Sequence, residues 1–209
     1  KQIDEFIRRW DKFPVSPERR ANPAWAQNTV DGEDINLFDI LPLFRLNDDG
    51  SVTPVLAADH TVSEDGLTHT FTLRDGVTFH SGDPLTAADV KYSIERVTAE
   101  ASKSSRKKSL STIAGIETPD DKTVVVKLAS RSISLPYNLS YVWIVNDAAS
   151  DITATEDGTG PYVLDGWKRG TASSLKAFDG YWGEKPKNGG ATISYFTEAA
   201  ALDNALLTA

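Results

Sequence analysis

The stretch of sequence that decides the fold runs from residue 62 to residue 90 and reads VSEDGLTHTFTLRDGVTFHSGDPLTAADV. Over residues 67–73, apolar or aromatic side chains alternate with threonines, which is the pattern of a strand with one buried face. The expected buried side chains are Leu67, His69, Phe71 and Leu73. Asp75-Gly76 follows directly, and an Asp-Gly pair favours a tight two-residue turn. We therefore expect a hairpin that turns at Asp75-Gly76.

The residues after this turn predict a helix with a defined start. Thr86 is followed three positions later by Asp89, a spacing that resembles a capping box. Small and apolar residues then recur at helical spacing, namely Val90, Ser93, Ile94 and Val97. We therefore expect a capped helix with one narrow packing face.

Similar patterns predict more strands along the chain. These lie at residues 113–118, 122–128, 162–167, 174–178 and 192–196. The first two are expected to pair around the turn at residues 119–121, and the next two to pair with each other. Thr197 is placed to cap an alanine-rich helix at the end of the sequence. The combination predicts a mixed α/β fold.

The composition is that of an ordinary globular protein of 209 residues, with 40% hydrophobic and 25% charged residues. No run of about 18 apolar residues occurs, so we expect no membrane-spanning helix. The net charge of −8 argues against sequence-independent nucleic-acid binding, which needs a positive surface. The absence of cysteine excludes disulfides, thiol catalysis and cysteine-ligated metals. The basic residues 103–108 are expected to form a solvated loop, with a partner-binding patch as the alternative.

The strand, turn and helix of residues 62–97 also form part of a larger pattern. The other parts are LNDDGSVTPVLA at 46–57, GTGPY at 158–162, FDGYWG at 178–183 and the helix at 199–207. In this order and spacing, the blocks resemble the extracytoplasmic solute-binding proteins (family 5) that feed ABC importers of peptides, nickel and related solutes. The resemblance covers residues 36–209, whereas residues 1–35 depart from the family's opening pattern.

The resemblance implies a two-lobed clamp, of which this chain holds one incomplete lobe of the periplasmic-binding-protein type. On the family's plan, residues 1–43 begin the first lobe and residues 44–145 form an inserted mixed-sheet domain. Residues 146–209 then continue the first lobe. The second lobe is expected to be absent, which would make the chain a fragment.

The resemblance also implies a function. We expect a monomeric, non-enzymatic protein without a cofactor that captures a peptide or small solute between its lobes and delivers it to an ABC permease in the membrane. Its location would be extracytoplasmic, in the periplasm or as a cell-surface lipoprotein. The N-terminus carries no apolar signal segment, so we expect that segment to have been removed or omitted. The alternatives are an oligosaccharide, nickel-chelate or opine-like cargo, and an enzyme or stand-alone interaction domain that reuses the lobe.

The candidate ligand-binding residues are those that the resemblance places beside the cleft. They are Asn36, Phe38, Asp39, Tyr141, Trp143, Gly160 and Tyr162. For Tyr141 and Trp143, the alternative is that they are core aromatic residues of a strand. For Gly160 and Tyr162, the alternative is a structural turn, in which glycine permits positive φ and close backbone approach.

Other residues that could carry chemistry have simpler interpretations. His69 and His80 would lie on the two facing strands of the expected hairpin, nearly diagonal to one another, where two imidazoles and a carboxylate could bind a metal. Ordinary sheet residues are the favoured interpretation, and we expect no metal site. Tyr181 and Trp182 are expected to anchor a loop against the core. No serine-hydrolase elbow, phosphate-binding loop or zinc-peptidase motif occurs, so we expect no catalytic residues.

Overall fold

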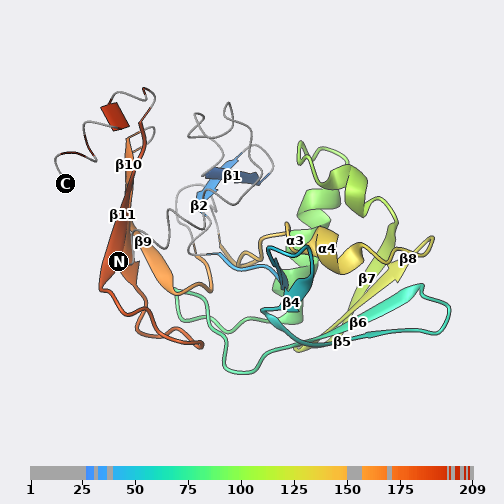
Figure 1. The fold of residues 1–209 in the computed structure, drawn as a ribbon. Helices are drawn as coiled ribbons and strands as arrows, with labels where there is room; N and C mark the ends of the chain where they lie inside the picture. The colour runs from blue at the N-terminus through green and yellow to red at the C-terminus, as the bar shows by residue number, and fades with distance from the viewer. Residues whose placement is uncertain are drawn as a thin grey trace.

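The computed structural model describes residues 27–30, 33–36, 40–149, 157–168 and 171–196, together with residues 198, 201, 202, 205 and 207. The elements in chain order are β1 (Gln27–Val30), β2 (Glu33–Asn36), β3 (Phe44–Leu46), β4 (Val52–Pro54), β5 (Ala57–Val62), β6 (Thr68–Leu73), α3 (Ala87–Thr98), η2 (Lys107–Leu110), β7 (Ile113–Asp120), β8 (Thr123–Leu128), α4 (Leu135–Leu139), β9 (Tyr162–Lys168), β10 (Ala172–Ala177) and β11 (Gly190–Ser194). Figure 1 shows two main groups: β5–β8 with α3 and α4 beside them, and the separate sheet β9–β11.

The larger sheet is antiparallel and has the strand order β5-β6-β8-β7. Its inner strands alternate buried and more exposed residues, so one face of the sheet is apolar. On β6 the buried side chains are His69, Phe71 and Leu73, as the alternation predicts, while Leu67 is half-buried. This face and α3 enclose one core, whose largest fully buried members include Phe71, Phe79, Leu85, Ile94, Leu110, Leu139 and Ile144.

The prediction of a hairpin that turns at Asp75-Gly76 is wrong. Strand β6 is central, because β5 pairs with one of its edges and β8 with the other, so no edge remains for the residues after Gly76. The turn itself forms, with a φ of +71° at Gly76, but the Val77 carbonyl accepts a hydrogen bond from the Leu85 amide at 3.0 Å. The hairpin that forms instead joins β5 to β6 through a turn at Gly66, where φ is +70°.

Helix α3 begins where the capping box predicts. One oxygen of the Asp89 carboxylate accepts hydrogen bonds from the backbone N–H and the hydroxyl of Thr86, both at 2.8 Å. Its other oxygen accepts from the Asp147 amide at 2.9 Å, so this buried carboxylate also ties the helix to a much later segment. The predicted packing face is confirmed, because Val90, Ser93, Ile94 and Val97 are all buried.

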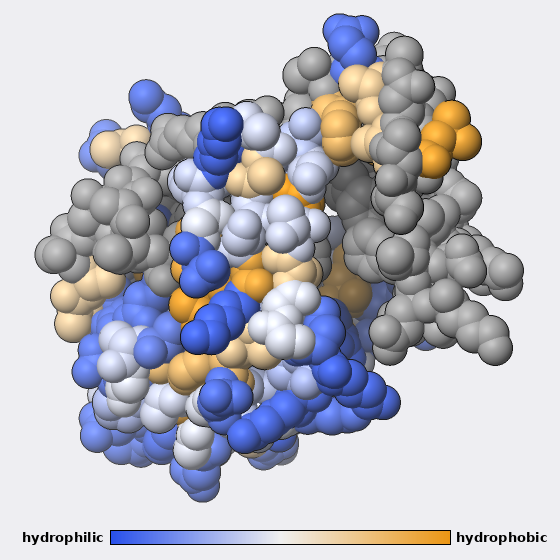
Figure 2. All heavy atoms as spheres, turned by 90° about the vertical axis from the view of Figure 1, so that its left-hand side faces the viewer, coloured by the Kyte–Doolittle hydropathy of each residue, from blue (hydrophilic) through white to orange (hydrophobic). Residues whose placement is uncertain are grey.

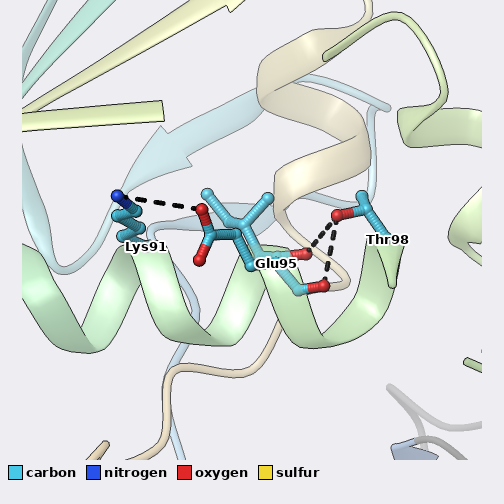
Figure 3. Close-up of polar contacts among 4 residues, drawn as sticks. Lys91, Glu95 and Thr98 are labelled. Atoms are coloured by element: carbon cyan, nitrogen blue, oxygen red, sulfur yellow. Dashed lines mark hydrogen bonds and ion pairs between the residues drawn. The ribbon is translucent and has the colours of Figure 1, made fainter. Parts of the chain in front are cut away.

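The exposed side of α3 carries a weaker contact. Lys91 Nζ lies 3.8 Å from Glu95 Oε1 (Figure 3). In the last turn, the Thr98 hydroxyl donates to the carbonyls of Ile94 and Glu95 at 3.0 and 3.3 Å. An exposed i,i+4 ion pair contributes only about 0.3–0.5 kcal/mol. The helix is therefore held mainly by its buried face and its cap.

The smaller sheet is antiparallel and has the order β11-β10-β9. The predicted pairing of β9 with β10 is confirmed, with a register shift between Ser174 and Leu175, and the predicted third strand forms at β11. Leu175 is buried, whereas Leu164 and Ile193 are only half-buried. Figure 2, which views the molecule from this side, shows hydrophilic residues with small apolar areas between them. This sheet buries its apolar residues less completely than the larger one.

Three other expectations can be compared with the structure. Strands β7 and β8 pair on either side of the predicted turn. The final helix is described only at residues 201, 202, 205 and 207, which are helical, and its expected cap Thr197 lies outside the described residues. The basic stretch at residues 103–108 is not only loop, because its end belongs to the short 3₁₀ helix η2.

Across the part of the chain that the structure describes, no helix has the length and apolar character needed to cross a membrane.

Replacing Asp89 with alanine should lower the free energy of unfolding by about 2–4 kcal/mol, because three donors lose a buried charged acceptor. Glu95→Ala on the same helix is the matched control, and it should cost less than about 0.5 kcal/mol. Urea denaturation followed by circular dichroism measures both variants. Equal losses would contradict the role given to the Asp89 carboxylate.

Candidate functional site

Four segments meet where the two sheets join, and we call this region the junction. They are residues 40–43, 78–84, 143–147 and 157–162. Pro42 and Trp143 form an isolated antiparallel bridge, and Trp143 packs against the buried side chains of Ile40 and Val145. The chain that leaves α4 thus returns to the residues that precede β3.

His80 fixes the turn that leads into β9. Its backbone N–H donates to the Gly158 carbonyl at 2.8 Å. Its ring Nε2 lies 3.0 Å from the Gly160 carbonyl, and its Nδ1 lies 3.4 Å from the Gly158 nitrogen. Because a carbonyl accepts and an amide donates, these contacts assign the neutral tautomer with its proton on Nε2. Phe178 packs edge-on against the same ring, with centroids 4.8 Å apart.

Asn146 connects two carboxylates across the junction. Its Nδ2 donates to Asp83 Oδ2 at 3.1 Å and to Asp157 Oδ2 at 2.8 Å. The other Asp157 oxygen accepts from the Ser81 amide at 2.9 Å. Asn146 itself is only 5% exposed, and its two hydrogen bonds are partly buried. They tie together three segments that are far apart in the sequence.

Trp182 reaches the same turn from the smaller sheet's side. Its indole N–H donates to the Thr159 carbonyl at 3.3 Å, and its ring packs against the core of the larger sheet. The Arg74 guanidinium carbon lies 5.2 Å from the ring centroid, a cation–π arrangement. The prediction that Trp182 anchors a loop against the core is confirmed. Burial raises the pKa of its neighbour Tyr181, because the phenolate loses hydration.

The turn at residues 158–160 is buried, and its carbonyls accept hydrogen bonds from His80 and Trp182. Among the described residues, the glycines with positive φ are Gly50, Gly66, Gly76 and Gly82. Gly158 and Gly160 therefore do not use the positive-φ freedom expected of them. These contacts favour the structural interpretation of the turn.

The sequence-predicted ligand residues fall in different places. Trp143, Gly160 and Tyr162 belong to the junction; Gly160 is buried and the two aromatic residues are half-buried. The Tyr162 hydroxyl donates to Asn188 Oδ1 at 2.7 Å. Asn36 ends strand β2. Phe38 and Asp39 lie outside the described residues.

Tyr141 has a separate environment beside α4. The Arg106 guanidinium carbon lies 3.7 Å from the centroid of the Tyr141 ring. The Tyr137 hydroxyl lies 3.3 Å from the Tyr141 hydroxyl. Burial, followed by the Tyr137 hydrogen bond, raises the pKa of Tyr141. The alternative for Tyr141 and Trp143, core aromatic residues of a strand, is wrong about the strand, because Tyr141 lies in a turn and Trp143 makes only an isolated bridge. Trp143 does pack against the buried Ile40 and Val145.

Sequence reasoning missed the polar side chains of the junction, namely His80, Asp83, Asn146 and Asp157. Asn146 directly follows an apolar run at residues 142–145, which is a signal for a buried polar group that needs partners. Its partner Asp83 precedes it by 63 residues. No local pattern identifies a contact at that separation.

The expected pairing of His69 with His80 is wrong. His69 instead faces His60 on the neighbouring strand, with His60 Nε2 lying 2.9 Å from His69 Nδ1. His80 does not belong to this sheet and contacts the turn at Gly158 and Gly160. Within the described ranges, no group of three or more His, Asp or Glu side chains is placed to hold a metal ion.

Comparison with known proteins identifies the family. The family model described as bacterial extracellular solute-binding proteins, family 5 middle, matches residues 51–209. Protein XP55 of Streptomyces lividans is 36% identical over 171 residues, which are 78% of this chain and 30% of that protein. The structure of the binding protein AgaA from A. tumefaciens R10, in complex with agropinic acid, superposes with a TM-score of 0.77 and 34% identity. That superposition covers 82% of this chain and 36% of AgaA.

A further match concerns a short segment. Over 48 residues, or 23% of this chain, the sequence is 90% identical to a phenolic acid decarboxylase of Escherichia coli O157:H7. Those residues make up only 10% of that enzyme, so the match does not transfer its activity to this chain.

The chain spans 36% or less of the length of each of these relatives. Its mixed α/β architecture is that of a periplasmic-binding-protein lobe, as the sequence predicts. The family model covers well over half of the chain. The chain therefore belongs to the family 5 bacterial extracellular solute-binding proteins.

Proposed function

We propose that this chain is part of the extracytoplasmic substrate-binding component of an ABC import system. That component captures a peptide or a related small solute between two lobes and passes it to the membrane permease. The observation that carries this proposal is the family match across residues 51–209. In a two-lobed clamp, ligand affinity reflects preference for the closed state, so capture requires surfaces from both lobes.

The proposal assigns the two groups of elements to different parts of one lobe. Residues 44–145 are the inserted domain, and residues 146–209 continue the lobe. Two features support this division. The elements from β3 to α4 contribute to one core. The Pro42–Trp143 bridge brings together the chain segments at which the inserted domain begins and ends. The hydrogen bonds of His80 and Asn146 then hold the domain against the segment that leads into β9.

Within this lobe, the proposed cleft wall comprises Trp143 and Tyr162, together with Asn36, Phe38 and Asp39, which shortly precede the bridged Pro42 in the sequence. Gly160 is buried in the turn, and its proposed role is to position Tyr162. The half-buried rings of Trp143 and Tyr162 retain exposed surface that a ligand could contact. Tyr141 is the weakest member of the proposed set, because the Arg106 guanidinium covers its ring.

A peptide is the first proposed cargo, because binding proteins of this class hold a peptide backbone in the manner of an added strand and tolerate many side chains. The AgaA complex supports a second candidate. That protein binds agropinic acid and is 34% identical to this chain, so a small organic acid of that type is the alternative cargo. The family is one of binding proteins, which supports a non-enzymatic role.

Deleting the gene should abolish uptake of a labelled tripeptide by its bacterium, and a plasmid copy should restore the uptake. If tripeptide uptake persists while uptake of labelled agropinic acid is lost, the second candidate replaces the first. Undiminished uptake of both compounds would contradict the import function.

The 209 residues alone should show no tight, stoichiometric binding of di- to pentapeptides, because the chain spans only 36% of the AgaA clamp and closure needs an opposing surface. Isothermal titration calorimetry with a defined peptide mixture measures this. Tight binding with saturable heat would show that one lobe is sufficient and would overturn the clamp mechanism.

Replacing His80 with alanine should weaken the junction, because the Gly160 carbonyl loses its donor and Gly158 loses its acceptor. The free energy of local opening should fall by about 1–3 kcal/mol. Hydrogen-exchange mass spectrometry of residues 157–162 measures the loss of protection, with Lys91→Ala as a surface control. Protection equal to that of the wild type would show that the histidine does not hold the turn.

A further inference from the structure

Positive charge is concentrated in the stretch between α3 and β7, which includes η2. Residues 101–116, which we call the basic segment, contain Lys103, Arg106, Lys107 and Lys108 but no Asp or Glu. The ion pairs among the described residues involve other cations, so no described carboxylate neutralises these four. The basic segment therefore carries uncompensated positive charge on a chain whose net charge is −8.

Two of these cations are held in place and the other two are exposed. The Arg106 guanidinium lies over the Tyr141 ring, as described above. Lys107 Nζ donates to the Glu100 carbonyl at 2.6 Å. Lys103 and Lys108 are exposed, and a lysine side chain can extend its charge toward a partner. The basic segment thus combines fixed positive charge with two side chains that reach outward.

Exposed apolar side chains belong to the helix that packs beside the basic segment. Asn138 of α4 donates to the Ser109 carbonyl at 3.0 Å, which attaches this helix to η2. On the same helix, Tyr137 is 40% exposed and packs edge-on against Tyr141, with ring centroids 5.5 Å apart. Ile133, which shortly precedes the helix, is fully exposed. Exposed aliphatic and aromatic side chains next to Lys and Arg are typical of surfaces that lie in a membrane interface.

We propose that the basic segment, together with Ile133 and Tyr137, is a docking surface for an anionic phospholipid bilayer, and we call this surface the lipid patch. Charge complementarity is the first argument, because the cations of the patch meet lipid phosphates. An acidic chain with evenly spread charge would be repelled by such a bilayer in every orientation, whereas the patch gives one attractive orientation. The exposed Ile133 and Tyr137 favour lipid over an acidic protein segment, because they can enter the headgroup layer.

The position of the lipid patch separates it from the junction. In Figure 1, α4 lies on the side of α3 that is away from β9–β11. The patch also shares no residue with the four segments of the junction. Docking through the patch would therefore orient the protein on a membrane and leave the proposed cleft wall uncovered. This role goes beyond the solute capture proposed above.

The test is co-sedimentation of the full chain with phosphatidylcholine vesicles that contain or lack phosphatidylglycerol. The wild type should bind the vesicles with phosphatidylglycerol and leave the others unbound. Raising the ionic strength to about 1 M, where the Debye length is about 3 Å, should release it. The double variant Lys103→Gln/Lys108→Gln should bind roughly 30-fold more weakly, because each cation at an anionic surface strengthens binding about fivefold.

Lys185→Gln/Lys187→Gln is the matched control, because it changes the net charge equally and both lysines are exposed in the segment between β10 and β11. Its binding should equal that of the wild type. Ile133→Ser removes an apolar member of the lipid patch whose side chain is fully exposed, so the fold should be unaffected. This variant should bind the anionic vesicles more weakly than the wild type at low salt.

Absence of wild-type binding to the anionic vesicles would overturn the lipid patch. Equal losses in the two double variants would also overturn it, because they would show an effect of net charge alone. Binding to soluble polyglutamate but not to vesicles would replace the bilayer with an acidic protein partner. Each of these outcomes leaves the proposed import function standing, since the assay contains no solute.

Discussion

The structure depends on the central position of β6. Both edges of this strand are hydrogen-bonded, and its face of His69, Phe71 and Leu73 is buried against the core that α3 completes. Because no edge remains free, the residues after Gly76 cannot join the sheet and must leave it. They form their own turn and bring His80 and Asp83 to the junction. The same constraint that builds the larger core therefore supplies the contacts that hold the two sheets together.

Local patterns in the sequence predict the strand β6 and the helix α3 correctly, but they place the hairpin at the wrong turn. Alternation in β6 and the capping box at Thr86 involve residues within a few positions of each other, so the sequence carries their signal directly. An Asp-Gly pair stands on each side of β6, at residues 65–66 and 75–76, and both pairs form turns. Strand β8, which lies about 50 residues later in the sequence, decides which of these turns makes a hairpin. It pairs with the edge of β6 that β5 leaves free. The competition between strands for this edge depends on tertiary contacts, so no local sequence pattern reveals it.

In the candidate site, too, local features could be predicted and long-range contacts could not. The turn at residues 158–160 and the anchor at Trp182 could be predicted from their residue types and positions. Their partners could not, because His80 and Asn146 act on residues that a local pattern does not connect with them. The family model matches residues 51–209. The chain's family membership therefore rests on the part that builds both sheets.

The central physical claim concerns the junction: partly buried hydrogen bonds from His80, Asn146 and Trp182 make the two sheets one cooperative unit. Equilibrium unfolding in urea measures this most directly, by comparing tryptophan fluorescence, to which Trp143, Trp167 and Trp182 contribute, with far-ultraviolet circular dichroism. The account predicts that the two transitions coincide at a single midpoint. Two separated transitions, with one sheet unfolding before the other, would contradict it.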